Sequence, residues 1–246
     1  MNVDLIQLKS LWQQAFGDPS DAIEVFFRTG FSPDRCSYVL ENGIPVSALY
    51  WFDCTLSGQK FAYLYAIATA KAHRGKGHFR RLMEDTHRIL KTQGYAGAVL
   101  VPAEAELFDL YEKLGYRAAA TVREFACQAA EPPIPLTQID ARQYAALRQM
   151  YLPNGGLEQA VPALDFYATY GQFYEGADFL LACCVQDGVL RAQEILGNTA
   201  ACGNILCTLG VQTGTFRAPG KGKVFAMYYP LQSDCPAPDY LGFALD

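Results

Sequence analysis

The residues with the clearest chemical potential lie in segment 65–83, where a glycine-containing turn separates a strand pattern from an amphipathic helix pattern. Gly75 and Gly77 permit close approach of a ligand to the backbone, because glycine has no Cβ. The unpaired N–H groups at the start of the following helix carry the positive end of its dipole and favour a phosphate. Four basic side chains add positive charge here: Arg74, Lys76, Arg80 and Arg81. The segment therefore predicts an anion site, and a plain strand-to-helix connection is the alternative.

The composition limits which partners the protein can have. The 246 residues include 20 basic and 25 acidic side chains, a formal net charge of −5, and 51% of them are hydrophobic. This predicts a folded chain with a large core, and the acidic balance argues against a nucleic-acid partner. No apolar run reaches the roughly 18 residues of a membrane span, and the N-terminus lacks the basic start of a signal peptide. We therefore expect a cytoplasmic protein without a membrane partner, and its oligomeric state stays open.

The eight cysteines and three histidines show no metal-binding pattern. No Cys-x-x-Cys occurs, and His73, His78 and His87 do not complete a ligand spacing typical of zinc sites. In a reducing cytoplasm an even number of cysteines does not imply disulfides. Cys183 and Cys184 lie in an apolar run, where cysteines serve as small hydrophobic residues. The sequence thus predicts no bound metal.

The elements that must position the turn follow from hydrophobic periodicity in the first half of the chain. Apolar residues at helical spacing predict helices, alternation predicts strands, and Asn42-Gly43 is typical of a hairpin turn. On the strand at 61–69, alternation places Tyr63, Tyr65 and Ile67 on one face, where Tyr63 and Tyr65 are candidates to line an acceptor pocket and plain core packing is the alternative. The predicted helices are 3–16, one after 18–20, 82–90 and 105–114, and the predicted strands are 36–41, 44–53, 61–69, 96–101 and 116–127.

A proline-rich segment, with Pro132, Pro133 and Pro135, divides the chain into two halves. We expect domains at 1–128 and 137–246, joined by a linker at 129–136. The order helix, helix, hairpin, helix, strand occurs in both halves, a weak structural echo without a sequence repeat. The second half is predicted to contain helices at 139–151, 162–174 and 199–209, a hairpin of 178–185 with 189–196, and strands at 224–229 and 240–245.

A second motif, Leu110-Tyr-Glu-Lys-Leu-Gly-Tyr116, follows Arg74 at the separation that a helix, a strand and a helix require. With the turn Arg74-Gly-Lys-Gly77, it resembles the GNAT superfamily of acyl-CoA-dependent N-acyltransferases. The resemblance covers about residues 1–126 and the rest in outline. It implies an α/β (α+β) fold with a mixed central sheet flanked by helices, followed by a second, smaller GNAT-like domain that is degenerate because it lacks the turn.

The resemblance also implies that acetyl-CoA is the co-substrate and lies where two central parallel strands separate. In the superfamily the last position of the turn motif is small, and Phe79 departs from this. An asparagine often found near the start of the next helix is replaced by Glu104. Carried over position by position, the coenzyme A-binding residues are Ile67, Ala68, Thr69, Arg74, Gly75, Lys76, Gly77, His78, Phe79 and Arg80.

Tyr111 matches the tyrosine that protonates the departing coenzyme A thiolate in many GNAT enzymes. A primary amine must lose a proton before it attacks the thioester, and Glu41, Asp53 and Glu104 are unranked candidates for the base. We expect an N-acetyltransferase acting on a small-molecule or peptide amine by direct attack. A non-catalytic acyl-CoA sensor is the alternative, and peptidyl transfer from aminoacyl-tRNA disagrees with the net charge.

Two further features are weaker. The turn Gly220-Lys-Gly-Lys223 looks like a phosphate loop, but a strand pattern follows it, so a loop between strands is the better interpretation. Some relatives use a C-terminal carboxylate as a base, and Asp246 is the corresponding residue here. We do not favour that role.

Overall fold

The computed structural model describes residues 4–245, and its first half contains every helix and strand predicted above. Asn42 and Gly43 have φ of 51° and 80°, because a two-residue turn between twisted strands needs two positive φ angles. The elements are α1 (Leu5–Phe16), α2 (Ser20–Thr29), η1 (Pro33–Arg35), β1 (Cys36–Glu41), β2 (Ile44–Leu56), β3 (Gln59–Thr69), η2 (Lys71–His73), α3 (His78–Thr92), β4 (Gly97–Leu100), α4 (Glu106–Glu112) and β5 (Arg117–Gln128).

The second half follows a similar order with shorter helices, but it adds the short strands β6 and β7 and has no helix between β11 and β12. Asp140 starts its first long helix with a capping box, in which its side chain accepts from Gln143 N–H and the Gln143 side chain accepts from Asp140 N–H. The elements are β6 (Thr137–Ile139), α5 (Ala141–Tyr151), β7 (Glu158–Gln159), α6 (Val161–Tyr167), β8 (Gln172–Glu175), β9 (Phe179–Gln186), β10 (Val189–Gly197), η3 (Thr199–Ala201), α7 (Cys202–Thr208), β11 (Thr213–Pro219) and β12 (Lys223–Pro230).

Two predictions for this half are wrong, and four of its described strands are not among those predicted: β6, β7, β8 and β11. The helix predicted at 162–174 ends at Tyr167, because Gly171 disfavours helix and the residues after it gain ladder hydrogen bonds with β9. The segment 240–245 is not a strand but extended chain with one bridge, between Tyr240 and Gly156. Strand β11 was not predicted, because its glycine, proline and two threonines hide the apolar alternation.

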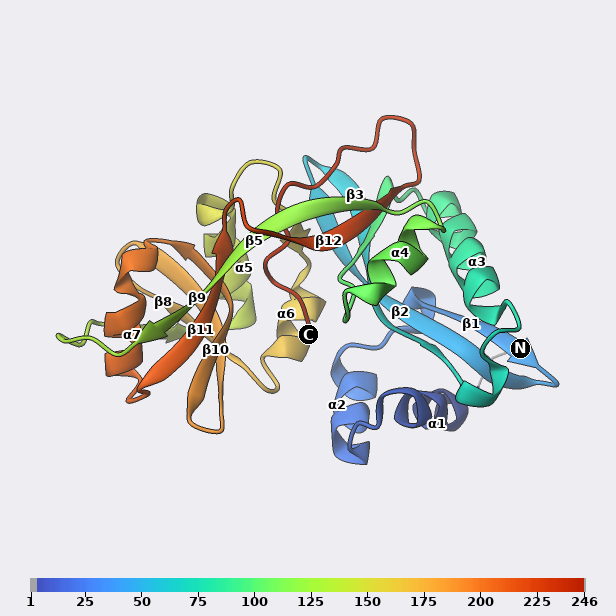
Figure 1. The fold of residues 1–246 in the computed structure, drawn as a ribbon, viewed down its shortest axis with the longest axis horizontal. Coiled ribbons are helices and arrows are strands. Elements are labelled where there is room, and N and C mark those ends of the chain that lie inside the picture. Colours follow the sequence, from blue (N-terminus) through green and yellow to red (C-terminus); the bar gives the residue numbers. More distant parts are fainter. Residues whose placement is uncertain (1–3, 246) are drawn as a thin grey trace.

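Within residues 4–245 the strands form a single twelve-stranded sheet, in the order β1-β2-β3-β4-β12-β5-β11-β10-β9-β8-β6, with β7 paired to β2. Strand β5 pairs with β12 along its first part and with β11 along its second. Figure 1 shows β5 and β12 side by side between two lobes, the first lobe containing β1–β4 and the second β6 and β8–β11. Residues 129–136 form neither helix nor strand. The domain division at that segment stays a prediction, and each lobe uses a strand from the other half of the chain.

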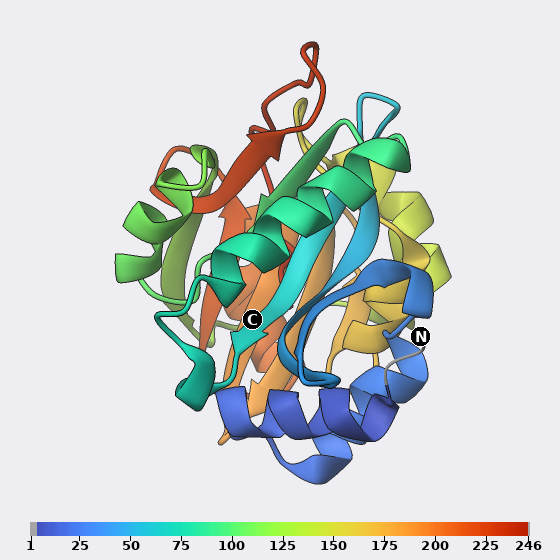
Figure 2. The ribbon, with the colours of Figure 1, turned by 90° about the vertical axis from the view of Figure 1, so that its right-hand side faces the viewer.

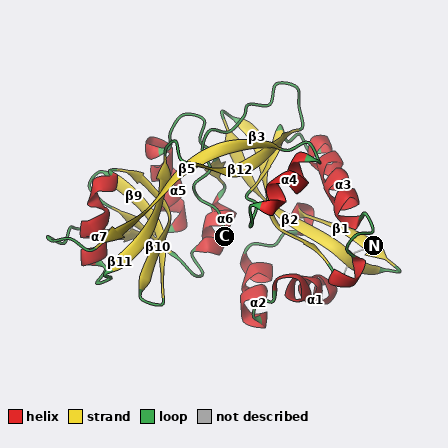
Figure 3. Ribbon diagram, viewed as in Figure 1, coloured by secondary structure: helices red, strands yellow, loops and turns green. Residues whose placement is uncertain are grey.

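The helices cover both faces of this sheet (Figure 3). Helix α3 crosses one face of β2 and β3 (Figure 2), above a core that includes Trp51 and Leu64. The opposite face of the sheet packs on α1 and α2 and forms a second core, which continues into α5 and α6. In it the ring centres of Phe26 and Phe166 are 5.3 Å apart. The two lobes therefore share a hydrophobic core. Among residues 4–245, no helix combines the length and apolar character needed to cross a membrane.

Candidate functional site

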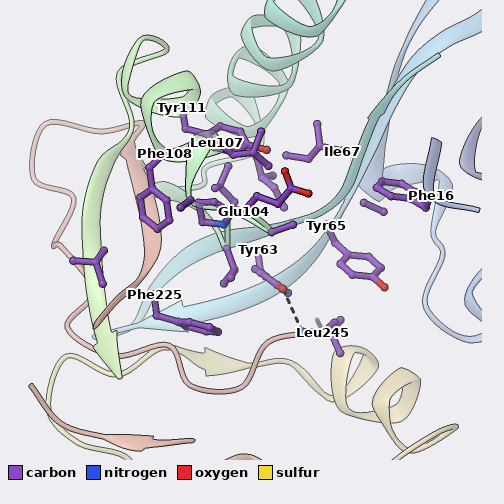
Figure 4. Close-up of a pocket in the computed structure, with 18 of the residues that line it drawn as sticks. Phe16, Tyr63, Tyr65, Ile67, Glu104, Leu107, Phe108, Tyr111, Phe225 and Leu245 are labelled. Carbon is purple, nitrogen blue, oxygen red and sulfur yellow. Dashed lines mark hydrogen bonds between the residues drawn. The ribbon is translucent and has the colours of Figure 1, made fainter. Parts of the chain in front are cut away.

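A cavity of about 690 Å³ opens where the two parallel strands of the first lobe separate (Figure 4). Strands β3 and β4 pair over three residues each, Phe61–Tyr63 with Gly97–Val99, and they diverge beyond these residues. Tyr65 and Ile67 of β3 line one side of the cavity, and Glu104 and the residues of α4 line the other. Such a wedge brings backbone and side chains to a ligand without disturbing the sheet.

Strand β3 has a bulge at the mouth of this wedge. Ala66 has φ of 49°, a strained conformation for a residue with a Cβ, and the β2–β3 register shifts opposite it. The extra residue inverts the alternation, so Ile67 packs with the core under α3 and not beside Tyr65. The predicted shared face of Tyr65 and Ile67 is wrong for this reason.

Of the three β3 residues predicted to bind coenzyme A, Ile67 lines the cavity. The carbonyls of the other two already accept local hydrogen bonds. Ser47 Oγ donates to Ala68 O at 2.8 Å, and Arg74 Nε donates to Thr69 O at 3.2 Å. Arg74 thus folds its guanidinium back over the end of β3 and ties the turn to the strand.

The glycine turn lies beyond the end of β3 and leads into α3. Gly75 and Gly77 have φ of 75° and 83°, and a Cβ at either position would meet nothing within 4 Å. Gly77 is the N-cap of α3, and no side chain caps the helix start. Arg74, Lys76, Arg80 and Arg81 are all exposed around it. The helix start is therefore open, positively charged and free to bind an anion. Among the described residues, those from Arg74 to Arg80 do not line the cavity itself.

Phe79, the departure from the family motif, points into the core. Its ring meets the Tyr111 ring edge-on at 5.9 Å, and it packs with the residues under α3. Its bulk is therefore taken up between α3 and α4. This contact couples the start of α3 to the tyrosine on α4.

Tyr111 lines the cavity from α4, as Figure 4 shows, and is only 7% exposed. Burial raises its pKa to about 12, so the phenol keeps its proton throughout the neutral range. Its ring packs between those of Phe79 and Tyr116. Among residues 4–245, none hydrogen-bonds to its hydroxyl. A proton on this oxygen is thus available to a ligand in the cavity.

The three candidate bases are widely separated. Glu104 lines the cavity. Asp53 accepts from the hydroxyl of Tyr95 and pairs with Arg35 and Lys60 at 3.5 and 3.7 Å. Glu41 lies at the end of β1, and its carboxylate is hydrogen-bonded to the imidazole ring of His73. Only Glu104, of these three, can reach a ligand in the cavity directly. Leu245 also lines it, with its N–H donating to Tyr63 Oη at 3.3 Å, and Asp246 lies outside the described residues.

The sequence matches a known family over this lobe. Residues 2–119 match the family model described as the acetyltransferase (GNAT) domain. Residues 2–119 are a GNAT domain. The two diverging strands β3 and β4, the glycine turn and Tyr111 all lie within it. Its family and fold support acyl transfer as the general chemistry. A comparison with curated protein sequences gave no match.

Solved structures share the fold over both lobes. A GCN5-related N-acetyltransferase from Kribbella flavida is 18% identical, with a TM-score of 0.71 over 92% of this chain and 69% of that one. One from Anabaena variabilis is 15% identical, with a TM-score of 0.71 over 93% and 70%. Eis1 from Mycobacterium abscessus is 13% identical, with a TM-score of 0.63 over 90% and 70%. At these identities the likeness shows the fold alone, a GNAT domain followed by a second GNAT-like lobe.

The second lobe contributes to the wall of the GNAT cavity, which the sequence analysis missed. Arg217 of β11 and Phe225 of β12 line it, with the guanidinium 4.1 Å from the ring centre. Arg217 also pairs with Glu124 at 2.9 Å. The exchange of β12 into the first lobe delivers Phe225, and the pairing of β11 with β5 brings Arg217 to the same wall. The only sequence signal was the turn at 220–223, which is indeed a loop between two strands.

The equivalent wedge of the second lobe is filled. Strands β10 and β11 pair in parallel over four residues each, Val189–Ala192 with Thr213–Phe216, and then diverge. Past this point Glu194 of β10 accepts two hydrogen bonds from Arg148, at 2.6 and 2.9 Å, and both side chains are buried. Arg217 of β11 donates to the carbonyl of Gly242 at 3.1 Å. The ion pair and the C-terminal segment therefore occupy the space that is open in the GNAT domain.

Proposed function

We propose that this protein is an N-acetyltransferase that transfers the acetyl group of acetyl-CoA directly to a primary amine. The observation that carries the proposal is the Tyr111 hydroxyl, which is protonated and unpartnered among the described residues and lines a wedge between diverging parallel strands. The acceptor is a small-molecule or peptide amine, and the proposed location is the cytoplasm. Neither nucleic acid nor a membrane surface is part of the proposal.

The co-substrate would bind along the wedge, with its pyrophosphate at the start of α3. The open N–H groups after Gly77 and the exposed basic side chains favour that group. The cavity of about 690 Å³ is large enough for the pantetheine end and an acceptor. The proposed coenzyme A residues remain those of β3 and the turn: Ile67, Ala68, Thr69, Arg74, Gly75, Lys76, Gly77, His78, Phe79 and Arg80.

In the proposed reaction, Glu104 takes a proton from the ammonium group, directly or through water. The free amine attacks the thioester carbonyl, so that a C–N bond forms and the C–S bond breaks. The leaving thiolate takes the proton of the Tyr111 hydroxyl, and the nitrogen of the new amide gives its surplus proton, through water, to the resulting tyrosinate. The amide and free coenzyme A then leave, with Tyr111 protonated again. Burial supports Tyr111 in this role, since its pKa of about 12 keeps the phenol protonated.

The test is Tyr111→Phe, assayed for free thiol and acetylated product with acetyl-CoA and a panel of primary amines. Loss of a general acid lowers kcat by about 10²- to 10⁴-fold, and KM for acetyl-CoA stays unchanged. The stability of the variant also stays unchanged, because among the described residues the hydroxyl has no partner to lose. Tyr151→Phe is the matched control, since it makes the same change on α5, away from the cavity.

Two results would contradict the proposal. Unchanged turnover in Tyr111→Phe would show that Tyr111 is not the acid. Calorimetric binding of acetyl-CoA without thiol release from any amine would instead favour the acyl-CoA sensor. A fall in the wild-type kcat between pH 7 and pH 10 that Tyr111→Phe lacks would contradict the raised pKa of Tyr111.

A further inference from the structure

Three side chains with metal-binding atoms meet beside the glycine turn. They are Glu41 at the end of β1, His73 at the end of η2 and His78 at the start of α3. Their ligand atoms all lie within 4.8 Å of one another. His73 Nδ1 is 2.5 Å from Glu41 Oε2, and His78 Nε2 is 3.5 Å from the same oxygen. Each residue comes from a different element, so the fold and not the local sequence brings them together.

His78 provides a second, independent observation that points to a ligand at this cluster. Its Nε2 is buried and has no hydrogen-bond partner among the residues that the structure describes. Glu41 Oε2 is the facing acceptor, but at 3.5 Å it does not form a hydrogen bond with this nitrogen. A buried polar nitrogen without a partner is costly and rare in folded proteins. An ion between Nε2 and the carboxylate would satisfy it.

The chemistry and spacing of the cluster fit zinc. Two imidazoles and one carboxylate, with a fourth position left to water, form a common zinc ligand set. Zinc–ligand distances of about 2.1 Å at tetrahedral angles place ligand atoms about 3.4 Å apart. The separation of 3.5 Å between His78 Nε2 and Glu41 Oε2 matches this value. His73 would move by about 1 Å, exchanging its hydrogen bond for a metal bond.

We propose that Glu41, His73 and His78 form a binding site for a divalent transition metal, with zinc as the best fit. The site would join the end of β1 to both ends of the glycine turn, because His73 directly precedes the turn and His78 directly follows it. It does not depend on the proposed acetyl transfer, and no described residue that lines the cavity takes part.

The experiment is a titration of chelator-treated protein with zinc chloride, followed by calorimetry, and with cobalt chloride, followed by absorption. We expect one ion per chain, a higher melting temperature with zinc, and a cobalt spectrum of nitrogen and oxygen ligands without thiolate bands. Loss of an outer partner of a metal ligand costs 10- to 100-fold in affinity. Glu41→Gln, which removes a ligand itself, should therefore weaken zinc binding by about 100-fold or more.

Glu24→Gln is the matched control, because Glu24 is an exposed carboxylate that pairs with Lys9 elsewhere on the surface. It should bind zinc as the wild type does. Three results would overturn the proposal: no zinc binding, equal binding by Glu41→Gln and the wild type, or thiolate bands that assign the ion to cysteines. His78→Gln provides a second test, with circular dichroism to confirm that it folds.

Discussion

The open glycine at the start of α3 allows a sharp test of the anion site. Gly77 has φ of 83°, and Gly58, in the hairpin between β2 and β3, has φ of 78°. A Cβ added at either position would meet nothing within 4 Å. Alanine in this left-handed conformation costs about 1–2 kcal/mol. Gly77→Ala and Gly58→Ala should therefore lose similar amounts of folding free energy.

The two variants should differ in their affinity for coenzyme A. The open space beside Gly77 is where we propose that the pyrophosphate meets the first N–H groups of α3. A methyl group there prevents the close approach that a hydrogen bond of about 2.9 Å requires. A hydrogen bond to a charged group contributes about 1.5–3 kcal/mol. The Kd for coenzyme A should thus rise about 10- to 150-fold in Gly77→Ala.

Isothermal titration with coenzyme A measures this effect, and urea unfolding measures the shared cost of the backbone conformation. Gly58→Ala should bind coenzyme A as the wild type does. If both variants bind coenzyme A with the affinity of the wild type, the phosphate site at α3 is refuted. If both lose the same amount of affinity, strain in the backbone, and not the lost contact, weakens binding.

Two further predictions concern stability. Burial lowers the pKa of His87 to about 4, and its ring stacks on Tyr229 at 4.0 Å. In the unfolded chain His87 takes up a proton near pH 6.5, whereas in the folded protein it does so only near pH 4. The free energy of unfolding should therefore fall by about 3 kcal/mol as the pH is lowered from above 6.5 to 4. His87→Phe should lack this part of the acid sensitivity in urea unfolding at pH 7 and pH 4. In Glu194→Gln the buried Arg148 loses its charge partner, so unfolding should become easier by about 3–5 kcal/mol. A loss below about 1 kcal/mol would show that the pair is solvated.

Local patterns account for the part of the fold that the sequence predicted. Asn42-Gly43 gives the first hairpin, because few other dipeptides accept two positive φ angles. The exchange of β12 into the first lobe could not be predicted in this way. The apolar run of β12 is compatible with pairing beside β5 in either lobe. Only the long-range pairing of β12 with β4 decides in which lobe it lies.

The features of the site also divide into those that local motifs predict and those that only distant contacts determine. Tyr111 and the glycine turn follow from contiguous motifs with a known spacing. The bulge at Ala66 does not, because nothing in an alanine signals a positive φ. Phe225 reaches the cavity through the exchange of β12, Arg217 through the pairing of β11 with β5, and Glu41 meets His73 across 32 residues. Each of these features depends on contacts between distant parts of the chain.

The two lobes show how one fold can hold an open site and a closed one. In both, two parallel strands pair for a few residues and then diverge. In the second lobe Glu194 and Arg148 satisfy each other in the gap, and Phe243 packs there against Tyr167, at 4.9 Å between ring centres. In the first lobe no described side chain bonds to the Tyr111 hydroxyl, and the bulge at Ala66 lies beyond the last paired residues of β3 and β4. A wedge that satisfies its own polar groups stabilises the fold, whereas a wedge that leaves one unsatisfied can bind a ligand.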